Sequence, residues 1–408
     1  MRPPPLLASE HLHEVKYEIR GALARRADEL EREGHDVVKL NIGNPGAFGF
    51  RMPATMRVAM VQNLPQADPY SHQKGIFQAR EAVVMQQQDR GVMEVTADDV
   101  LIGNGVSELI MLTMRALLNP GDEVLVPSPD YPLWTASVVI HGAKAVHYPC
   151  RTENGWVPDP KEVRALVTDK TRAIVIINPN NPTGAVYPEA VLRELVAIAE
   201  EHNLVVCGDE IYDEMLYEDA RYVPLATLVK HTLCLTFSGL SKIYRACGLR
   251  VGWVTFSGER AHARDYLDAV ELLASLRLCS NVPGQFAVQT ALGGHQSIFD
   301  LTRPGGRLFE TRRALLESIA ASRYLELVAP RGSMYGFVRI RTDRVGNGSF
   351  DDRAFALRLL EQKHVLVAPG SSFNVPYKDH FRTTLLPHPE LMRDVMGRIE
   401  ELLAEMAG

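Results

Sequence analysis

Chemically versatile side chains follow three short apolar runs of this sequence. The runs, each typical of a buried strand, are AIVII (173–177), LVVCG (204–208) and LCLTF (233–237). The segments after them supply an amide at Asn181, a carboxylate at Asp209 with a phenol at Tyr212, and a lysine at Lys242 with an arginine at Arg250. Ligands of an open α/β sheet bind outside the carboxyl ends of its strands. We therefore expect these side chains to meet in one pocket.

A glycine-containing turn adds a place for an anion. In IGNGVSE (102–108), an apolar run ends on a small turn just before the helical pattern ELIMLTMRALL. Such a turn directs backbone N–H groups at an anion, most often a phosphate. The turn lacks the third glycine of the dinucleotide-binding fingerprint. A cofactor with a phosphate, a ring nitrogen that needs a carboxylate and an aldehyde that needs a lysine would use all of these groups, and pyridoxal 5'-phosphate is that cofactor.

Length and composition exclude several other classes. A chain of 408 residues is too long for one simple core, so two lobes are expected. The net charge of −6, without a dense Lys/Arg run, argues against nucleic acid as a partner. The apolar runs are too short to cross a membrane, and the first residues do not resemble a secretion signal. The five scattered cysteines predict a reduced, cytoplasmic protein, and no metal site is expected.

The elements that must position the pocket alternate along the chain. From about residue 100, strand-like runs alternate with helical patterns such as PEAVLRELVAIAEEH (188–202). This order predicts an α/β fold with a mostly parallel sheet covered by helices. After about residue 303, the strand YGFVRI, a helix around 352–363 and a last helix from about 389 indicate a smaller α+β domain. A charged helix over roughly 14–33 and the strand VVKLNIG should join that smaller domain.

Three motifs, NPNNPTG, DEIY and S-K-x7-R, are jointly very specific in this order and spacing. With them the chain resembles the class I aminotransferases of the fold-type I pyridoxal-phosphate superfamily, from about residue 14 to the end. Phrases such as KLNIGNPGAFGF, PSPDYPLWTA and LRLCSNVPGQFAVQTALGG resemble most the bacterial glutamate–pyruvate (alanine) aminotransferases. The resemblance implies a seven-stranded sheet in a large cofactor-binding domain (61–304), a small C-terminal domain (305–408), and an N-terminal arm that is partly in the small domain (1–60).

The resemblance also implies a role for each residue of the pocket. Lys242 should hold the cofactor as a Schiff base and, once freed by the substrate amine, move the proton between the substrate Cα and the cofactor. Asp209 should pair with the protonated ring nitrogen, while Asn181 and Tyr212 should hydrogen-bond the phenolate oxygen of the ring. Further cofactor contacts are expected from the turn residues Gly105, Val106 and Ser107, from Arg250, from the stacking ring of Tyr131, from Tyr70 of a neighbouring subunit, and from Ser238 and Ser241, which flank Gly239 where the family usually has a hydroxyl.

Substrate binding requires a cation for the α-carboxylate of an amino acid. Arg382 in DHFRTTLLP matches the arginine that the family uses, and a guanidinium can hold a carboxylate with two parallel bonds. Gly43 in LNIGNP and Asn181 should line the substrate pocket. Tyr17 and Arg20, on the charged N-terminal helix, are expected to fold over the site and meet the second carboxylate of glutamate. The reaction would be a ping-pong transamination between L-alanine and 2-oxoglutarate in a homodimer with shared sites.

Other functions stay open on the sequence alone. A nicotinamide dehydrogenase on a similar sheet conflicts with the incomplete glycine fingerprint and leaves Lys242 without a role. A non-catalytic regulator with an aminotransferase-like domain would need an added DNA-binding module, for which the sequence before residue 14 is too short. A pyridoxal-phosphate lyase or decarboxylase would use the same cofactor residues. So would transaminases for aromatic, branched-chain or aspartate substrates.

Overall fold

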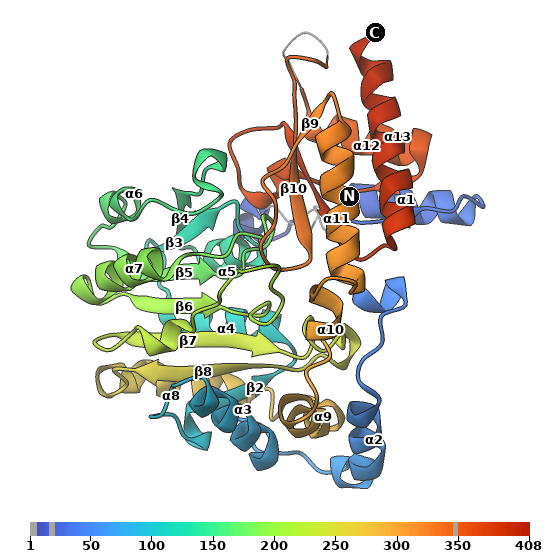
Figure 1. The fold of residues 1–408 in the computed structure, drawn as a ribbon. Coiled ribbons are helices and arrows are strands. Elements are labelled where there is room, and N and C mark those ends of the chain that lie inside the picture. Colours follow the sequence, from blue (N-terminus) through green and yellow to red (C-terminus); the bar gives the residue numbers. More distant parts are fainter. Residues whose placement is uncertain (1–5, 16–20, 346–349) are drawn as a thin grey trace, which may run out of the picture.

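The computed structural model describes residues 6–15, 21–345 and 350–408. Figure 1 shows a large sheet with helices on its faces, and beside it a second group of elements formed mainly by the orange and red C-terminal part of the chain. No helix in these described ranges is both long and apolar enough to cross a membrane.

The central sheet contains seven strands in the order β2-β8-β7-β6-β5-β3-β4. Neighbouring strands from β4 to β7 pair in parallel, whereas β8 is antiparallel to both β7 and β2. The predicted α/β fold with a mostly parallel, seven-stranded sheet is therefore confirmed. The strand bounds are β2 Val100–Gly103, β3 Glu123–Ser128, β4 Lys144–Pro149, β5 Thr171–Ile177, β6 Val205–Asp209, β7 Leu233–Gly239 and β8 Gly252–Gly258.

Alternate strand residues build two apolar layers, one on each face of this sheet. On β5, Ala173, Val175 and Ile177 join one buried cluster, whereas Ile174 and Ile176 join the other. This alternation follows from the two-residue period of a strand. Because helices cover both faces, the strands are continuous apolar runs in the sequence. Helices α4 (Val106–Leu117), α5 (Leu133–Ile140) and α8 (Arg264–Leu276) contribute to the first layer, and α3 (Phe77–Asp89), α7 (Glu189–Glu201) and α9 (Val282–Gly293) to the second.

The second group of elements is built on a four-stranded antiparallel sheet in the order β12-β13-β10-β9. On this sheet Tyr335 lies opposite Thr384 and Phe337 lies opposite Arg382, so all four side chains belong to one face. The bounds are β9 Leu325–Glu326, β10 Tyr335–Ile340, β12 Ala368–Pro369 and β13 His380–Thr384, with helices α11 (Arg307–Ala321), α12 (Asp352–Lys363) and α13 (Pro389–Ala407).

The N-terminal segment is attached to the C-terminal elements. Strand β1 (Val38–Lys39) pairs in parallel with β11 (Val365–Leu366). Helix α1 (Ala22–Arg32) places Ala27 and Leu30 in a buried cluster with Leu360 of α12. These contacts join segments more than 300 residues apart in the sequence.

Two expected N-terminal elements differ from the prediction within the described residues. Of the helix expected over 14–33, residues 16–20 lie outside the described residues, and helix α1 covers Ala22–Arg32. Gly21, just before α1, has a non-helical ψ of −147°, and Val15 is extended. The strand expected over VVKLNIG is limited to the two residues of β1. The domain bounds stay a prediction: residue 60 lies within α2, and residue 304 lies between α10 and α11. The remaining helices are α2 (Ala54–Asn63), α6 (Pro160–Ala165) and α10 (Phe299–Thr302).

Candidate active site

A cavity of about 760 Å³ lies where β5, β6 and β7 end. All five side chains that the three strand ends supply, namely Asn181, Asp209, Tyr212, Lys242 and Arg250, line it. The opposite wall comes from the segment after β1 and from β10 and β13, which contribute Gly43, Tyr335 and Arg382 among others. The cavity therefore lies between the central sheet and the C-terminal elements.

Asp209 is the last residue of β6 and is only 3% exposed. Its Oδ2 accepts a hydrogen bond from the indole Nε1 of Trp134 at 2.9 Å, whereas its buried Oδ1 has no hydrogen-bond partner among the described residues. Burial raises the pKa of Asp209 to about 6, against the opposing effect of the Trp134 bond. A buried unpartnered polar atom costs roughly 1–3 kcal/mol, more if charged. The Oδ1 is therefore placed to accept a hydrogen bond from a group bound in the cavity.

Lys242 follows the end of β7 by three residues and reaches the opposite wall of the cavity. Its Nζ donates to the carbonyl oxygen of Gly43 at 2.7 Å and lies 4.0 Å from the Sγ of Cys247. The positive charge of Lys242 also acts on Asp209 and lowers the pKa of that carboxyl group. The amine is thus held by a neutral oxygen in a large cavity, where it can react with a carbonyl group.

The turn before α4 forms an anion-binding corner with Arg250. Gly105 caps the helix with a φ of 84°, and a Cβ at this position would lie 2.3 Å from the Nη2 of Arg250. Only glycine therefore lets the guanidinium approach the N-terminus of the helix. Val106 and Ser107, the first two residues of α4, line the cavity beside it. The helix N-terminus and the guanidinium together favour a bound phosphate.

The other expected cofactor residues differ in whether they line the cavity. Ser241 and Tyr131 line the cavity, whereas Ser238 is buried within β7 and is not among the described lining residues. Tyr70 is 77% exposed and also lies outside the lining. Tyr17 and Arg20 lie outside the described residues.

Arg382 is held on β13 almost entirely by neutral groups. It is 1% exposed, and its Nη1 donates to the Oδ1 of Asn181 at 2.8 Å while its Nη2 donates to the carbonyl oxygen of Asn41. Its guanidinium carbon lies 4.3 Å from the ring centroid of Tyr335 and 4.7 Å from that of Phe373. Its Nε is buried without a hydrogen-bond partner among the described residues. These contacts leave the positive charge available for a carboxylate.

Asn181 and Tyr212 line the cavity and carry groups that can donate hydrogen bonds. Because Arg382 can only donate, it faces the Asn181 amide oxygen, so the amide Nδ2 points elsewhere. The Tyr212 hydroxyl donates to the hydroxyl oxygen of Tyr335 at 3.0 Å. Burial raises the pKa of Tyr212 well above its ordinary value, so this hydroxyl keeps its proton at neutral pH.

Several residues of the site were not predicted from the sequence. Tyr335 was expected only as part of a strand, yet a Cβ on Gly43 would lie 2.2 Å from its hydroxyl. The ring of Phe373 lies 4.7 Å from the Arg382 guanidinium carbon. Both contacts depend on how distant segments meet, and no local pattern shows this. Cys247 and Asn41 also line the cavity, and the sequence offers a signal for both. Cys247 lies five residues after Lys242, and Asn41 lies two residues before Gly43.

Comparisons with known proteins agree with this geometry. The profile of the family described as aminotransferase class I and II matches residues 35–399. The glutamate–pyruvate aminotransferase AlaA of Escherichia coli K12 is 50% identical over 383 residues, 94% of each chain. An alanine aminotransferase of Mycobacterium tuberculosis is 47% identical over 395 residues, which cover 97% of this chain and 91% of that relative.

Solved structures give the same result. The crystal structure of an aminotransferase from Escherichia coli matches with a TM-score of 0.97 at 47% identity, over 99% of this chain and 100% of that one. An alanine aminotransferase from Pyrococcus furiosus matches with a TM-score of 0.92 at 36% identity, over 98% and 100%. This chain therefore belongs to the class I and II aminotransferases.

Proposed function

We propose that this aminotransferase uses pyridoxal 5'-phosphate to exchange an amino group between L-alanine and 2-oxoglutarate, in a reversible ping-pong reaction. The observation that carries the cofactor assignment is the buried Oδ1 of Asp209, which has no hydrogen-bond partner in the described part of the chain and lies in the same cavity as Lys242. The substrate assignment draws on the names of two relatives, a glutamate–pyruvate aminotransferase at 50% identity and an alanine aminotransferase at 47%.

The groups of the cavity fit this cofactor one by one. A protonated ring nitrogen supplies the donor that Asp209 Oδ1 lacks. A phosphate suits the corner where Arg250 lies against Gly105, which a Cβ would close. A phenolate oxygen suits the donors of Asn181 and Tyr212. A cavity of about 760 Å³ is large enough for a small cofactor and an amino acid together.

The reaction requires that a proton leave the substrate Cα and that the resulting charge be spread. When bound, pyridoxal phosphate supplies an aldehyde that captures amines and a ring that withdraws electrons. The Nζ of Lys242 holds the cofactor at rest and, once displaced, takes the proton from Cα and returns it on the other side of the exchange. The negative charge of Asp209 favours the positively charged ring that this electron withdrawal needs.

The α-carboxylate of either substrate is proposed to bind Arg382. The guanidinium lies over the rings of Tyr335 and Phe373 and is bonded to Asn181, so its orientation is restricted before substrate arrives. A bidentate pair then orients the substrate Cα toward Lys242. Lysine could not replace it, because an ammonium group offers no planar pair of donors.

The second carboxylate of glutamate needs a further cation. Lys39 lines the cavity, but its Nζ already lies 2.8 Å from both Asp28 and Glu31. We therefore retain Arg20, together with Tyr17, for this role. Replacing Arg20 with Ala should raise KM for glutamate and 2-oxoglutarate much more than KM for alanine. Equal changes would exclude the role.

Two further assignments extend the proposal. Tyr70 is exposed outside the cavity, and we propose that it reaches the phosphate of a second subunit in a homodimer with shared sites. Exposed apolar side chains at Leu272, Leu276 and Phe77 suit such an interface. All five cysteines are unpaired, and the cytoplasmic location stays a prediction from the sequence.

A half-reaction screen tests the proposal. The protein is loaded with pyridoxal phosphate, each amino acid is added in turn, and the visible absorbance of the bound cofactor is followed. Alanine and glutamate should remove the band fastest, and pyruvate or 2-oxoglutarate should restore it. Faster loss with aspartate, aromatic or branched-chain amino acids would overturn the substrate assignment. Failure to form any visible band would overturn the cofactor assignment.

A further inference from the structure

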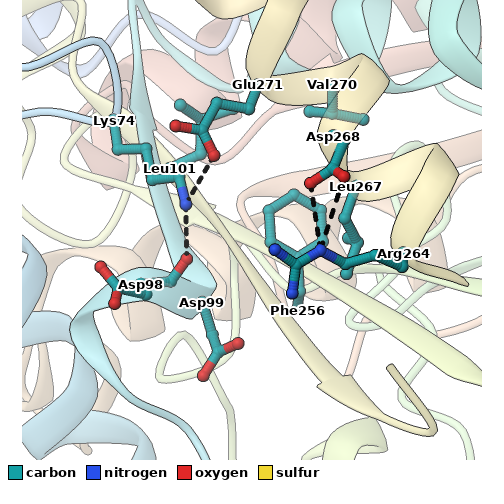
Figure 2. A pocket seen from close by; sticks show the side chains of 10 residues that line it. All are labelled: Lys74, Asp98, Asp99, Leu101, Phe256, Arg264, Leu267, Asp268, Val270 and Glu271. Atoms are coloured by element: carbon teal, nitrogen blue, oxygen red, sulfur yellow. Dashed lines mark hydrogen bonds and ion pairs between the residues drawn. The ribbon is translucent and has the colours of Figure 1, made fainter. Parts of the chain in front are cut away.

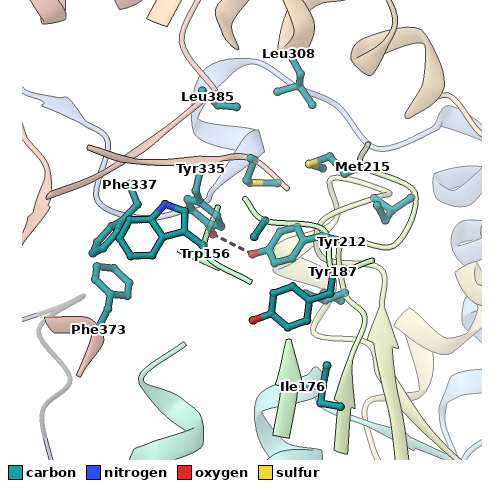
Figure 3. Close-up of a cluster of buried hydrophobic side chains, with 14 of the residues drawn as sticks. Trp156, Ile176, Tyr187, Tyr212, Met215, Leu308, Tyr335, Phe337, Phe373 and Leu385 are labelled. Atoms are coloured by element: carbon teal, nitrogen blue, oxygen red, sulfur yellow. Dashed lines mark hydrogen bonds between the residues drawn. The ribbon is translucent and has the colours of Figure 1, made fainter. Parts of the chain in front are cut away.

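Tyr335, the first residue of β10, touches both halves of the active site. It is 2% exposed, yet it lines the cavity. Figure 3 shows its hydroxyl directed at that of Tyr212. We propose that Tyr335 is a positioning residue that tunes the cofactor through Tyr212 and orients the substrate through Arg382. The inference rests on the proposed function, since it assumes that Tyr212 faces the cofactor and Arg382 faces a carboxylate.

The ring of Tyr335 fixes the plane of the Arg382 guanidinium. The guanidinium carbon lies 4.3 Å from this ring and 4.7 Å from the ring of Phe373. Tyr335 and Arg382 share one face of the antiparallel sheet. Tyr335 and Phe337 are two residues apart on β10 and so point to the same face, and Phe337 lies opposite Arg382. A cation between two aromatic faces gains electrostatic attraction and loses rotational freedom before the substrate binds. The ring therefore supports carboxylate binding without contacting the carboxylate itself.

The hydroxyl of Tyr335 acts on Tyr212 through a bond that can reverse. Tyr212 now donates to Tyr335 at 3.0 Å, but a hydroxyl has only one proton to donate. When Tyr212 turns its proton to the phenolate of the cofactor, its oxygen can accept the proton of Tyr335 across the same distance. Hydrogen bonds in such a chain strengthen one another. Tyr335 thus makes Tyr212 a stronger donor.

Gly43 holds this hydroxyl in its place. A Cβ on residue 43 would lie 2.2 Å from the Tyr335 hydroxyl oxygen, so only glycine leaves room for it. The carbonyl oxygen of the same residue accepts the bond from Lys242 Nζ at 2.7 Å. The Tyr335 hydroxyl is therefore adjacent to the segment that holds the reactive lysine, as well as to Tyr212.

Three variants of the cofactor-loaded enzyme separate the two actions. Tyr335→Phe removes only the hydroxyl, and the control Phe373→Leu removes only the second ring near Arg382. Tyr335→Leu removes both the Tyr335 ring and its hydroxyl. One measurement is the pH midpoint of the cofactor's visible absorbance. The other is the Kd of glutarate, a dicarboxylate without an amino or keto group, by calorimetry.

Tyr335→Phe should raise the pH midpoint by about 0.3 unit, in the same direction as Tyr212→Phe but less, and leave the glutarate Kd within about twofold. The midpoint rises because a weaker donor leaves more negative charge on the ring oxygen, which holds the titrating proton more tightly. Phe373→Leu should raise the glutarate Kd about fivefold without moving the midpoint. Tyr335→Leu should change both.

An unchanged or lowered midpoint in Tyr335→Phe would overturn the role of the hydroxyl. An unchanged glutarate Kd in Tyr335→Leu, or in Tyr335→Met if Tyr335→Leu does not fold, would overturn the role of the Tyr335 ring. Wild-type protein that forms no visible band with pyridoxal phosphate would instead overturn the proposed function. If the wild type forms a normal band but the Tyr335 variants change neither the pH midpoint nor the glutarate Kd, only the role of Tyr335 is contradicted.

Discussion

The molecule has a second cavity lined by charged side chains, and it differs from the active site in how its charges are paired. This side cavity of about 260 Å³ lies beside β2 and α8. Figure 2 shows Lys74 directed at Glu271 and Arg264 at Asp268, with nitrogen–oxygen distances of 2.8 and 3.3 Å. Its other two acids are paired as well, Asp99 with Arg260 at 2.6 Å and Asp98 with Arg80 at 3.5 Å.

In the active-site cavity, Asp209 and Arg382 are buried and meet mostly neutral partners, whereas Lys242 is half-buried and Arg250 is exposed. Asp209 bonds an indole and keeps one oxygen unpartnered among the described residues, and Arg382 bonds two neutral oxygens. Burying such groups is costly unless a ligand supplies the missing partner. Buried charge without an oppositely charged partner therefore marks the binding site better than the number of charged residues does. Exposed pairs as in the side cavity contribute little and call for no ligand.

The largest expected effect is the loss of Lys242. Lys242→Ala should lower transamination by about 10⁴-fold, because the variant lacks both the group that holds the cofactor and the base that moves the proton. Lys242→Arg, which keeps the charge but offers no suitable nucleophile, should do nearly the same. After borohydride reduction, mass spectrometry should find the cofactor on the Lys242 peptide of the wild type only. Attachment that persists in Lys242→Ala would assign the cofactor to another residue.

The second largest effect is expected at Asp209. Asp209→Asn keeps an acceptor for Trp134 but removes the charge that pairs with the ring nitrogen. Breaking a buried pair costs about 3–5 kcal/mol, so kcat/KM should fall by about 10²- to 10⁴-fold. Steady-state kinetics and the affinity for pyridoxal phosphate measure the change. A loss below about tenfold would mean that Asp209 faces no cation.

The sequence predicts the sheet-edge half of this site well and the opposite half poorly. Asn181, Asp209 and Lys242 each follow a buried parallel strand, and parallel strands end at a common edge, so local patterns suffice. Arg382 came from a family resemblance. Tyr335 and Phe373 were missed, because their contacts with Arg382 depend on how separate segments of the C-terminal part fold together, including the register of its antiparallel sheet. The pairing of charges in the side cavity depends on the same kind of tertiary contact.

A smaller effect is expected from Arg382→Lys. The variant keeps a positive charge but loses the planar pair of donors and the contact with two rings. A charge-assisted bond contributes about 1.5–3 kcal/mol, so KM for alanine and for pyruvate should rise by about 10- to 100-fold with a smaller change in kcat. Initial-rate measurements decide this. A change confined to kcat would contradict carboxylate binding by this residue.

The raised pKa of Asp209 also predicts how the stability of the cofactor-free protein depends on pH. Burial raises the folded-state pKa of Asp209 from 3.8 to about 6, so the folded protein holds this proton more tightly than the unfolded chain does. The stabilisation that the bound proton gives is fully present below about pH 4 and is lost as the pH rises through about 6. In the cofactor-free protein, Asp209→Asn should therefore be more stable than the wild type by on the order of 2 kcal/mol at pH 8, with no such gain at pH 4. Urea unfolding at both pH values measures the difference. An equal gain at both would show that charge is not the cause.

The smallest effect is expected in the side cavity. Glu271→Gln breaks the ion pair with Lys74 but keeps an oxygen that can accept the bond from Gln73. A partly exposed pair of this kind contributes about 0.2–1 kcal/mol, so the free energy of unfolding should fall by less than about 1 kcal/mol and transamination should not change. Urea unfolding and initial rates test both statements. Because Asp209→Asn makes the same acid-to-amide change in the active site, a comparable loss of activity in both variants would show that pairing does not distinguish the two cavities.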